Sequence, residues 1–255
     1  MAVAELAAGD VLARPREVGQ LELVWNRFRR HKLAVIGVWV LIALFVASFA
    51  GPMFTAYDPE AQFVGPIFGD LTWANPLGTD DVGRDVMTRL MYAGRISLLL
   101  AVIVTVASSL IGVVIGAVAG YFGGWADAVL MRLVDFLLTL PILPLLLILS
   151  AMSIRGGLPI LIPAGVTKLF GWIWNMPAER AEGVLILAII LIVFQWQNLA
   201  RLVRGQVLAL KAQTYSEAAQ ALGASSLHII LRHMIPNTLA PIIVVVPALM
   251  GFIVI

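Results

Sequence analysis

The sequence contains no cysteine and little charge. Without cysteine, its 255 residues form no disulfide and offer no thiolate ligand to a metal. Only 13% of the residues are charged, whereas soluble domains carry about 25%. A spanning helix needs about 20 mostly apolar residues, and the uncharged stretches that reach or approach this length are 33–57, 96–126, 136–154, 183–200 and 234–255. The sequence therefore predicts a multi-pass membrane protein with five spans.

Hydrophobic residues account for 61% of the chain, and its mean hydropathy is +0.97. Because backbone groups in lipid must be hydrogen-bonded within their own segment, unbroken apolar runs predict helices. A membrane β-barrel would instead show short alternating segments. We therefore expect an all-α helical bundle. The sequence also lacks the G-x-x-x-x-G-K-[ST] loop that cradles nucleotide phosphates, so no ATP site is expected on this chain.

The positions of Lys and Arg predict the orientation, since cytoplasmic loops carry the excess of positive charge. If residues 1–32 lie inside, alternation of the spans places eleven basic residues inside and six outside. The N-terminus is therefore predicted to be cytoplasmic. The resulting segments are a cytoplasmic tail 1–32, a first span 33–57, an extracytoplasmic segment 58–95, and a core 96–255 with an outer loop 155–182 and a cytoplasmic loop 201–238.

Two groups of residues on the predicted outer side have structural interpretations. Asp80, Asp81 and Asp85 lack the EF-hand spacing and its terminal Glu, so we expect helix caps and turn formers rather than a calcium site. The outer loop is apolar but interrupted by prolines. Its Trp172 and Trp174 suit the membrane interface, which predicts a re-entrant or surface-lying segment.

The cytoplasmic tail has apolar residues at helical spacing, Leu21, Val24, Trp25 and Phe28. This pattern predicts an amphipathic helix on the membrane surface, held by apolar contacts and by attraction of arginine to lipid. A helix that binds a partner protein is the alternative.

Glycine and proline mark two of the spans. Gly112, Gly116 and Gly120 form a stripe of small residues on one helix face, which allows close packing of helix backbones in lipid. Pro141 and Pro144 remove backbone donors from the third span and predict a bent helix.

The cytoplasmic loop contains signals for two short helices between long apolar runs. Thr214 and Glu217 form a capping-box pattern, T-x-x-E, and Gly223 supplies the positive φ that ends a helix. Ser225 or Ser226 then caps a second helix. So short a helix is marginal alone in water, which indicates that another surface packs on it.

One face of the first short helix carries Tyr215, Ala218, Ala219 and Leu222 at i, i+3, i+4 and i+7. The two alanines make this face shallow, so that another surface approaches closely. Helices that anchor in lipid prefer Leu, Phe and Trp instead. We therefore expect a docking knob, closed by Pro236 before the next span, with an amphipathic loop lying on the bilayer as the alternative.

The stretch "EAAQALGASSLHIILRHMIPN" resembles the EAA loop of the inner-membrane permeases of ABC importers. Glu217, Ala218, Ala219 and Gly223 match the motif, and Pro236 matches its closing proline. In that family the loop forms coupling helices that sit in a cleft of the cytoplasmic ATPase.

Two further stretches resemble the dipeptide, oligopeptide and nickel permeases of the DppC/OppC type. They are "RFRRHKLAVIGVWVLIALF" and "NPLGTDDVGRDVMTRLMYAGRISL". The resemblance extends from about residue 27 to 245, although His233 departs from the usual Ile and the loop 156–180 matches nothing in the family. Family members carry a sixth span. Because this sequence stops within an apolar run, we expect it to be part of a longer protein with a type I ABC importer permease fold.

The resemblance implies a non-catalytic permease subunit in a bacterial or archaeal inner membrane. Its implied partners are a second permease, two cytoplasmic ATPases that hold the ATP and Mg²⁺, an extracytoplasmic substrate-binding protein and membrane lipid, with no nucleic acid. Peptides are the implied cargo, and nickel or another small solute is the alternative. The residues assigned to ATPase coupling are Tyr215, Glu217, Ala218, Ala219, Leu222 and Gly223, and those assigned to helix packing are Gly112, Gly116 and Gly120.

Two other classes of protein are disfavoured by the residues themselves. A secondary transporter driven by an ion gradient needs ionisable groups at mid-membrane, and the spans contain almost none. An intramembrane hydrolase has a candidate nucleophile set in Ser225, Ser226, His228 and His233. These residues fall on the cytoplasmic knob, and the sequence lacks a G-x-S-x-G elbow.

Overall fold

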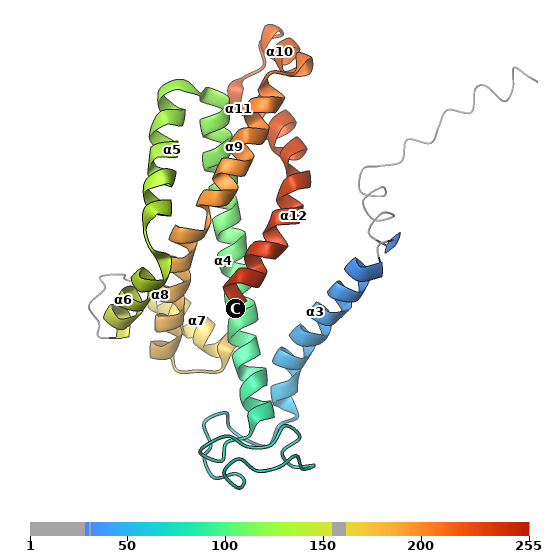
Figure 1. Ribbon diagram of the computed structural model, residues 1–255, viewed down its shortest axis with the longest axis vertical. Helices are drawn as coiled ribbons and strands as arrows, with labels where there is room; N and C mark the ends of the chain where they lie inside the picture. Colours follow the sequence, from blue (N-terminus) through green and yellow to red (C-terminus); the bar gives the residue numbers. More distant parts are fainter. Residues whose placement is uncertain (1–28, 31, 155–161, 255) are drawn as a thin grey trace, which may run out of the picture.

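A computed structural model describes residues 29–30, 32–154 and 162–254 of the chain (Figure 1). Over these ranges it contains helices and no strand, apart from an isolated bridge between Thr79 and Asp85. The helices are α3 (Lys32–Ala50), η1 (Gly51–Met53), α4 (Val86–Phe122), α5 (Gly124–Thr139), α6 (Ile142–Ile154), α7 (Ala164–Trp174), α8 (Ala178–Gln195), α9 (Gln197–Lys211), α10 (Thr214–Ala221), α11 (Ser226–Ile229), η2 (Ile230–Met234) and α12 (Ile235–Val254). The prediction of an all-α bundle is confirmed. The amphipathic helix predicted in the tail lies outside the described residues.

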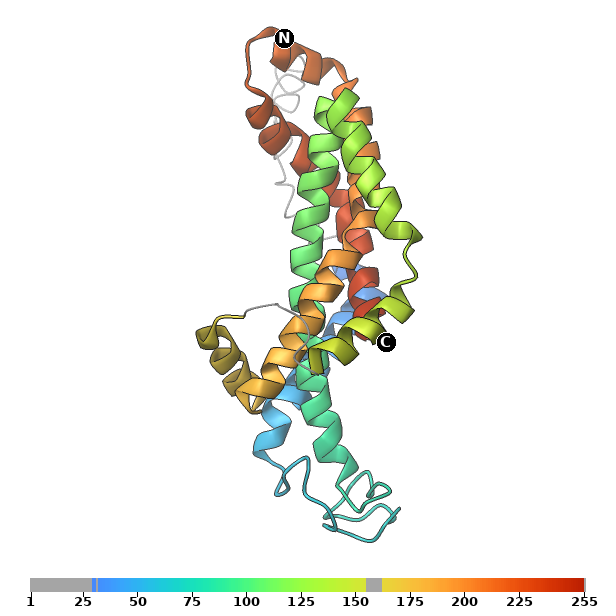
Figure 2. The same cartoon turned by 90° about the vertical axis from the view of Figure 1, so that its left-hand side faces the viewer.

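The long helix α4 is the axis of the bundle, and α8, α9 and α12 pack along it (Figures 1 and 2). Within the described ranges, four helical stretches are long and apolar enough to cross a membrane, or five if α5 and α6 count as one broken span. The largest buried cluster joins α4, α9, α11, η2 and α12 at the end of the bundle that carries α10. The largest part of the core therefore lies where the spans meet the loop that contains α10 and α11.

The third span differs from the single bent helix expected over 136–154. The structure divides this region into α5 and α6, which meet at 79°. Pro141 has no N–H to donate and disfavours the helical conformation in the residue before it. Leu140 accordingly has extended backbone angles and ends α5.

The N-terminal helix α3 contacts the bundle mainly at its outer end and diverges from it toward the other end (Figure 1). Arg95 of α4 makes this contact. Its Nη2 donates a hydrogen bond of 2.9 Å to the carbonyl of Phe49, and its guanidinium lies 5.4 Å from the centre of the Phe49 ring. A cation at the C-terminus of a helix is favourable, so Arg95 anchors α3 on α4.

The described part of the outer loop forms α7, and its two tryptophans have different environments. Trp172 is exposed, as a residue at the membrane interface would be. Trp174 is buried against Ala181 and Leu185 of α8 and Phe170 of its own helix. The expectation that both tryptophans lie at the interface is therefore wrong for Trp174, because α7 folds back onto α8 and encloses it.

Candidate coupling surface and outer cavity

The loop 201–238, which the sequence predicts to be cytoplasmic, forms a compact two-helix knob at one end of the molecule (Figure 1). Helix α10 begins three residues after the end of α9, and its N-cap is Gln213, whose side chain makes no capping bond. The predicted capping box is therefore wrong, because Thr214 is already the first helical residue. Glu217 lies in the first turn, where a carboxylate interacts favourably with the helix dipole.

The turn between α10 and α11 has the conformation that its sequence indicates. Gly223 has φ of +83°, and its N–H donates to the carbonyl of Gln220 at 2.9 Å. The next N–H, of Ala224, donates to the carbonyl of Ala219 at 3.1 Å. Ser225 is the N-cap of α11, and its Oγ accepts a hydrogen bond from the N–H of His228. The bend between the two helices is thus fixed by local hydrogen bonds.

Most of the residues assigned to coupling lie on the surface of the knob. Leu222 is 89% exposed and Tyr215 is 41% exposed. Glu217, Ala218 and Gly223 are exposed as well. Leu222 therefore presents an uncovered apolar side chain on the knob.

Ala219 is different, because it packs against the buried cluster that includes Ile229 and Met234. Its neighbour Ser216 is fully buried. The helix therefore turns this side toward the bundle, and Ala219 is not part of the outer surface. The exposed surface extends instead to Leu227 and Leu231, which sequence reasoning did not select.

The second short helix does not end at Pro236 as expected. After α11 the chain forms the π-helical turn η2 and continues into α12, of which Pro236 is the second residue. Pro236 donates no N–H to the helical ladder, but its fixed φ of about −65° is that of a helix, so the chain continues through it. The knob is consequently connected to α12 without a break.

The three stripe glycines of α4 lie directly against α9. A Cβ atom added at Gly112 would be 2.9 Å from the carbonyl oxygen of Trp196, and at Gly116 it would be 2.5 Å from that of Ala200. At Gly120 it would be 2.9 Å from the carbonyl oxygen of Arg204. A methyl group has no room at these positions, so the two helix backbones are in close contact.

Basic side chains of α9 bind the C-terminal end of α4 and two carboxylates of α5. Nε and Nη2 of Arg204 donate to the two carboxylate oxygens of Asp127, and Arg201 pairs with Asp135. Nζ of Lys211 donates to the carbonyl of Tyr121 at 2.7 Å. The sequence analysis did not predict these pairs, although a charge next to an apolar span is itself a signal for a partner.

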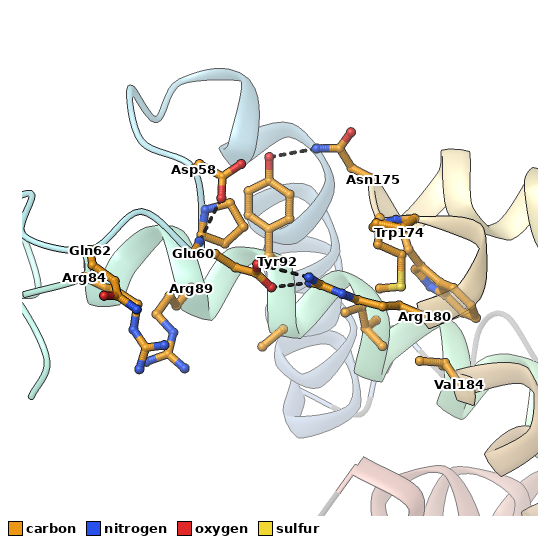
Figure 3. A pocket seen from close by; sticks show the side chains of 15 residues that line it. Asp58, Glu60, Gln62, Arg84, Arg89, Tyr92, Trp174, Asn175, Arg180 and Val184 are labelled. Carbon is orange, nitrogen blue, oxygen red and sulfur yellow. Dashed lines mark hydrogen bonds and ion pairs between the residues drawn. The ribbon is translucent and has the colours of Figure 1, made fainter. Parts of the chain in front are cut away.

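The outer end of the molecule contains a cavity of about 750 Å³ that sequence reasoning missed (Figure 3). Arg180 of α8 forms an ion pair with Glu60 across it, and the amide of Asn175 donates to the hydroxyl of Tyr92 at 3.2 Å. The lining residues are Asp58, Pro59, Glu60, Gln62, Arg84, Arg89, Tyr92, Ala93, Ile96, Trp174, Asn175, Met176, Pro177, Arg180 and Val184.

Carboxylates order the outer segment beside this cavity. Asp85 is the N-cap of α4 and accepts from the N–H of Thr88 at 2.8 Å. Desolvation raises the pKa of Asp80, but hydrogen bonds from the N–H groups of Arg84 and Val82 and from the Arg84 guanidinium outweigh it, so this pKa lies well below its ordinary value. In the described ranges no group of three or more His, Asp and Glu side chains is placed to hold a metal.

A bundle of apolar helices, with a bent two-helix knob between two of its spans, defines the class of multi-pass membrane proteins. Residues 112–255 match the family described as binding-protein-dependent transport system inner membrane component. The chain belongs to this family and has its type I permease fold. Residues 19–71 match the N-terminal TM domain of oligopeptide transport permease C.

Three relatives illustrate this similarity. The dipeptide transport system permease protein DppC of Bacillus subtilis (strain 168) is 34% identical over 92% of this chain and 65% of its own length. The oligopeptide transport system permease protein OppC of the same organism is 33% identical over 86% of this chain and 63% of its own length. The glutathione transport system permease protein GsiD of Pectobacterium atrosepticum is 31% identical over 86% of this chain and 64% of its own length. The aligned part of the chain thus spans just under two thirds of each of these relatives.

Proposed function

We propose that this chain is one of two permease subunits of an ATP-driven importer of peptides. The similarity to proteins named as dipeptide and oligopeptide permeases supports the cargo. The observation that carries the proposal is the knob of α10 and α11, an exposed and internally braced surface at the end of the bundle. In this proposal the knob docks on a cytoplasmic ATPase, which binds and hydrolyses the ATP.

The chemistry of the knob suits a protein partner. Glu217 is the only acidic residue between positions 201 and 238, and the exposed surface that extends to Leu231 also carries the cation Arg232. Exposed Leu222 and Tyr215 provide apolar contacts beside it. Apolar anchors next to one charged group are typical of the energetically important part of an interface.

Movement of the knob would pass to the spans through α9. The glycine stripe fits α4 closely against α9, and the ion pair between Arg204 and Asp127 attaches α5. Closure of the ATPases would then displace these helices together and alternate the access of the pathway between two states. The chain lies with its N-terminus and knob inside and with the outer cavity facing the substrate-binding protein.

The test is uptake into proteoliposomes that contain the full-length transporter with its second permease and ATPases, and its binding protein outside. We expect accumulation of a labelled dipeptide that requires ATP on the ATPase side and persists when the ion gradients are collapsed. Uptake driven by a proton gradient without ATP would refute the proposal. Uptake of nickel in place of any peptide would refute the cargo while leaving the coupling mechanism intact.

A further inference from the structure

The outer cavity combines charges of both signs with an apolar floor. Ile96 of α4 and Val184 of α8 line it together with Trp174 and Met176, while charged side chains come from the outer segment, α4 and α8. Its volume of about 750 Å³ is within the ~300–1,000 Å³ typical of small-molecule sites. Such a lining suits a ligand that is itself charged at both ends.

The positive end is formed by two arginines that share one carboxylate. Nε of Arg84 and Nη1 of Arg89 both donate to Oδ2 of Asp80. Asp81 also lies 3.8 Å from Arg84, but it is largely exposed and its attraction is therefore screened by water. A guanidinium has five N–H donors, so most donors of this pair stay available to an incoming carboxylate.

The negative end is formed by Asp58. One of its oxygens accepts from the N–H of Glu60 at 2.9 Å, and its charge also interacts with that of Arg180. Asp58 lines a neighbouring hollow together with Lys168 as well. In Figure 3 its carboxylate and the two guanidinium groups lie on opposite sides of the Glu60–Arg180 pair. The cavity thus has a separate place for an ammonium group and for a carboxylate group.

We propose that this cavity binds a short peptide with free termini, its carboxylate on Arg84 and Arg89 and its ammonium group on Asp58. The apolar floor accommodates a side chain of the peptide, and the Glu60–Arg180 pair faces its backbone amides. This site would make the permease itself discriminate between peptides, in addition to the binding protein. The inference rests on the proposed function, because that function supplies the peptide as cargo.

Equilibrium binding of tritiated alanyl-leucine to the assembled transporter in nanodiscs, without the binding protein, tests the site. We expect saturable binding that weakens about tenfold in Arg89→Gln, as for the loss of a hydrogen bond to a charged group. Amidation of the peptide carboxylate should weaken binding to the wild type at least as much, because it affects both arginines, and should weaken binding to Arg89→Gln less, because only Arg84 remains there. N-acetylation of the peptide, which removes its ammonium group, should weaken binding to the wild type and should weaken binding to Asp58→Asn less. Asp70→Asn removes an exposed charge of the outer segment that does not line the cavity, and it is the matched control for Asp58→Asn.

Absence of saturable binding to the wild type would overturn the inference. So would independent, additive effects of amidation and Arg89→Gln, or a loss in the Asp70→Asn control equal to that in Asp58→Asn. The ATP-driven uptake experiment separates these failures from failure of the proposed function. One result would refute the peptide site but support the proposed importer. In it, the transporter takes up dipeptide when the binding protein is present but binds no dipeptide when the binding protein is absent.

Discussion

Arg204 of α9 holds Asp127 of α5 through both carboxylate oxygens, 77 residues apart in the sequence. The pair lies close to the turn between α4 and α5, where Gly123 and Gly124 have φ of +65° and +51°. Two consecutive glycines with positive φ form a turn that is flexible by itself. The turn by itself does not fix the position of α5. The ion pair fixes it, because it holds α5 on α9, the helix that leads into the knob.

Breaking this pair should uncouple ATP hydrolysis from transport. We expect Arg204→Gln to reduce peptide uptake about tenfold, which corresponds to a change of about 1.4 kcal/mol, while the ATPase rate changes much less. The charge-exchanged double variant Arg204→Asp with Asp127→Arg should recover part of the uptake. The measurement is uptake per ATP hydrolysed in proteoliposomes. An unchanged ratio in Arg204→Gln would show that α5 is not coupled through this pair.

The glycine stripe should tolerate no side chain. Gly116→Ala places a Cβ 2.5 Å from the carbonyl oxygen of Ala200. We therefore expect the free energy of unfolding to fall by about 1–3 kcal/mol, as it does when a core is overpacked. Gly205→Ala is the control, because a Cβ there meets no atom within 4 Å and alanine favours a helix. Thermal unfolding in detergent compares the two variants. A Gly116→Ala protein as stable as Gly205→Ala would contradict the close contact of α4 with α9.

Two neighbouring alanines on the knob should respond differently to a large side chain. Ala218→Trp alters the exposed surface, so it should prevent the ATPase from co-purifying without lowering the unfolding temperature. Ala219→Trp is forced into the buried cluster and should lower the unfolding temperature instead. Co-purification and thermal unfolding of both variants test this distinction. Retention of the ATPase by Ala218→Trp would argue against docking at α10.

The outer segment should depend on pH through Asp80. Because the pKa of this carboxyl is lowered in the folded protein, its contribution to stability is complete above the unfolded pKa of about 3.9 and is lost as the pH falls through the lower folded value. Hydrogen exchange of residues 58–85 is therefore expected to be constant from neutral pH down to about pH 4 once the intrinsic exchange rates are corrected for. Asp80→Asn should exchange faster at neutral pH. Equal protection of the variant and the wild type at neutral pH would contradict this role of Asp80.

The features that were predictable from the sequence are those with local causes. Uninterrupted apolar runs give the spans, and Gly223 and Ser225 mark the bend of the knob through their own backbone and side-chain chemistry. Ala219 was assigned to the outer surface because helical periodicity identifies a face but not what covers it. Its burial depends on Ile229 and Met234, which come from the following helix and π-turn.

The features that were not predictable depend on long-range contacts. Glu60 and Arg180 are 120 residues apart, and the cavity that they cross forms only when α8 lies beside the start of α4. Tryptophan is a residue type that suits the membrane interface, but Trp174 is buried because α7 folds back onto α8. A single sequence carries no signal for such pairings beyond the presence of charged residues near the spans.

The most direct test of the account is chemical crosslinking from the knob. Because the sequence has no cysteine, Ala218→Cys introduces a single thiol into this chain, on the exposed side of α10. With a bifunctional maleimide–photoreactive reagent on native membranes, we expect Ala218→Cys to capture an ATP-hydrolysing subunit, in an amount that changes when ATP is added. Capture of lipid alone, with and without ATP, would contradict the assignment of the knob as the coupling surface.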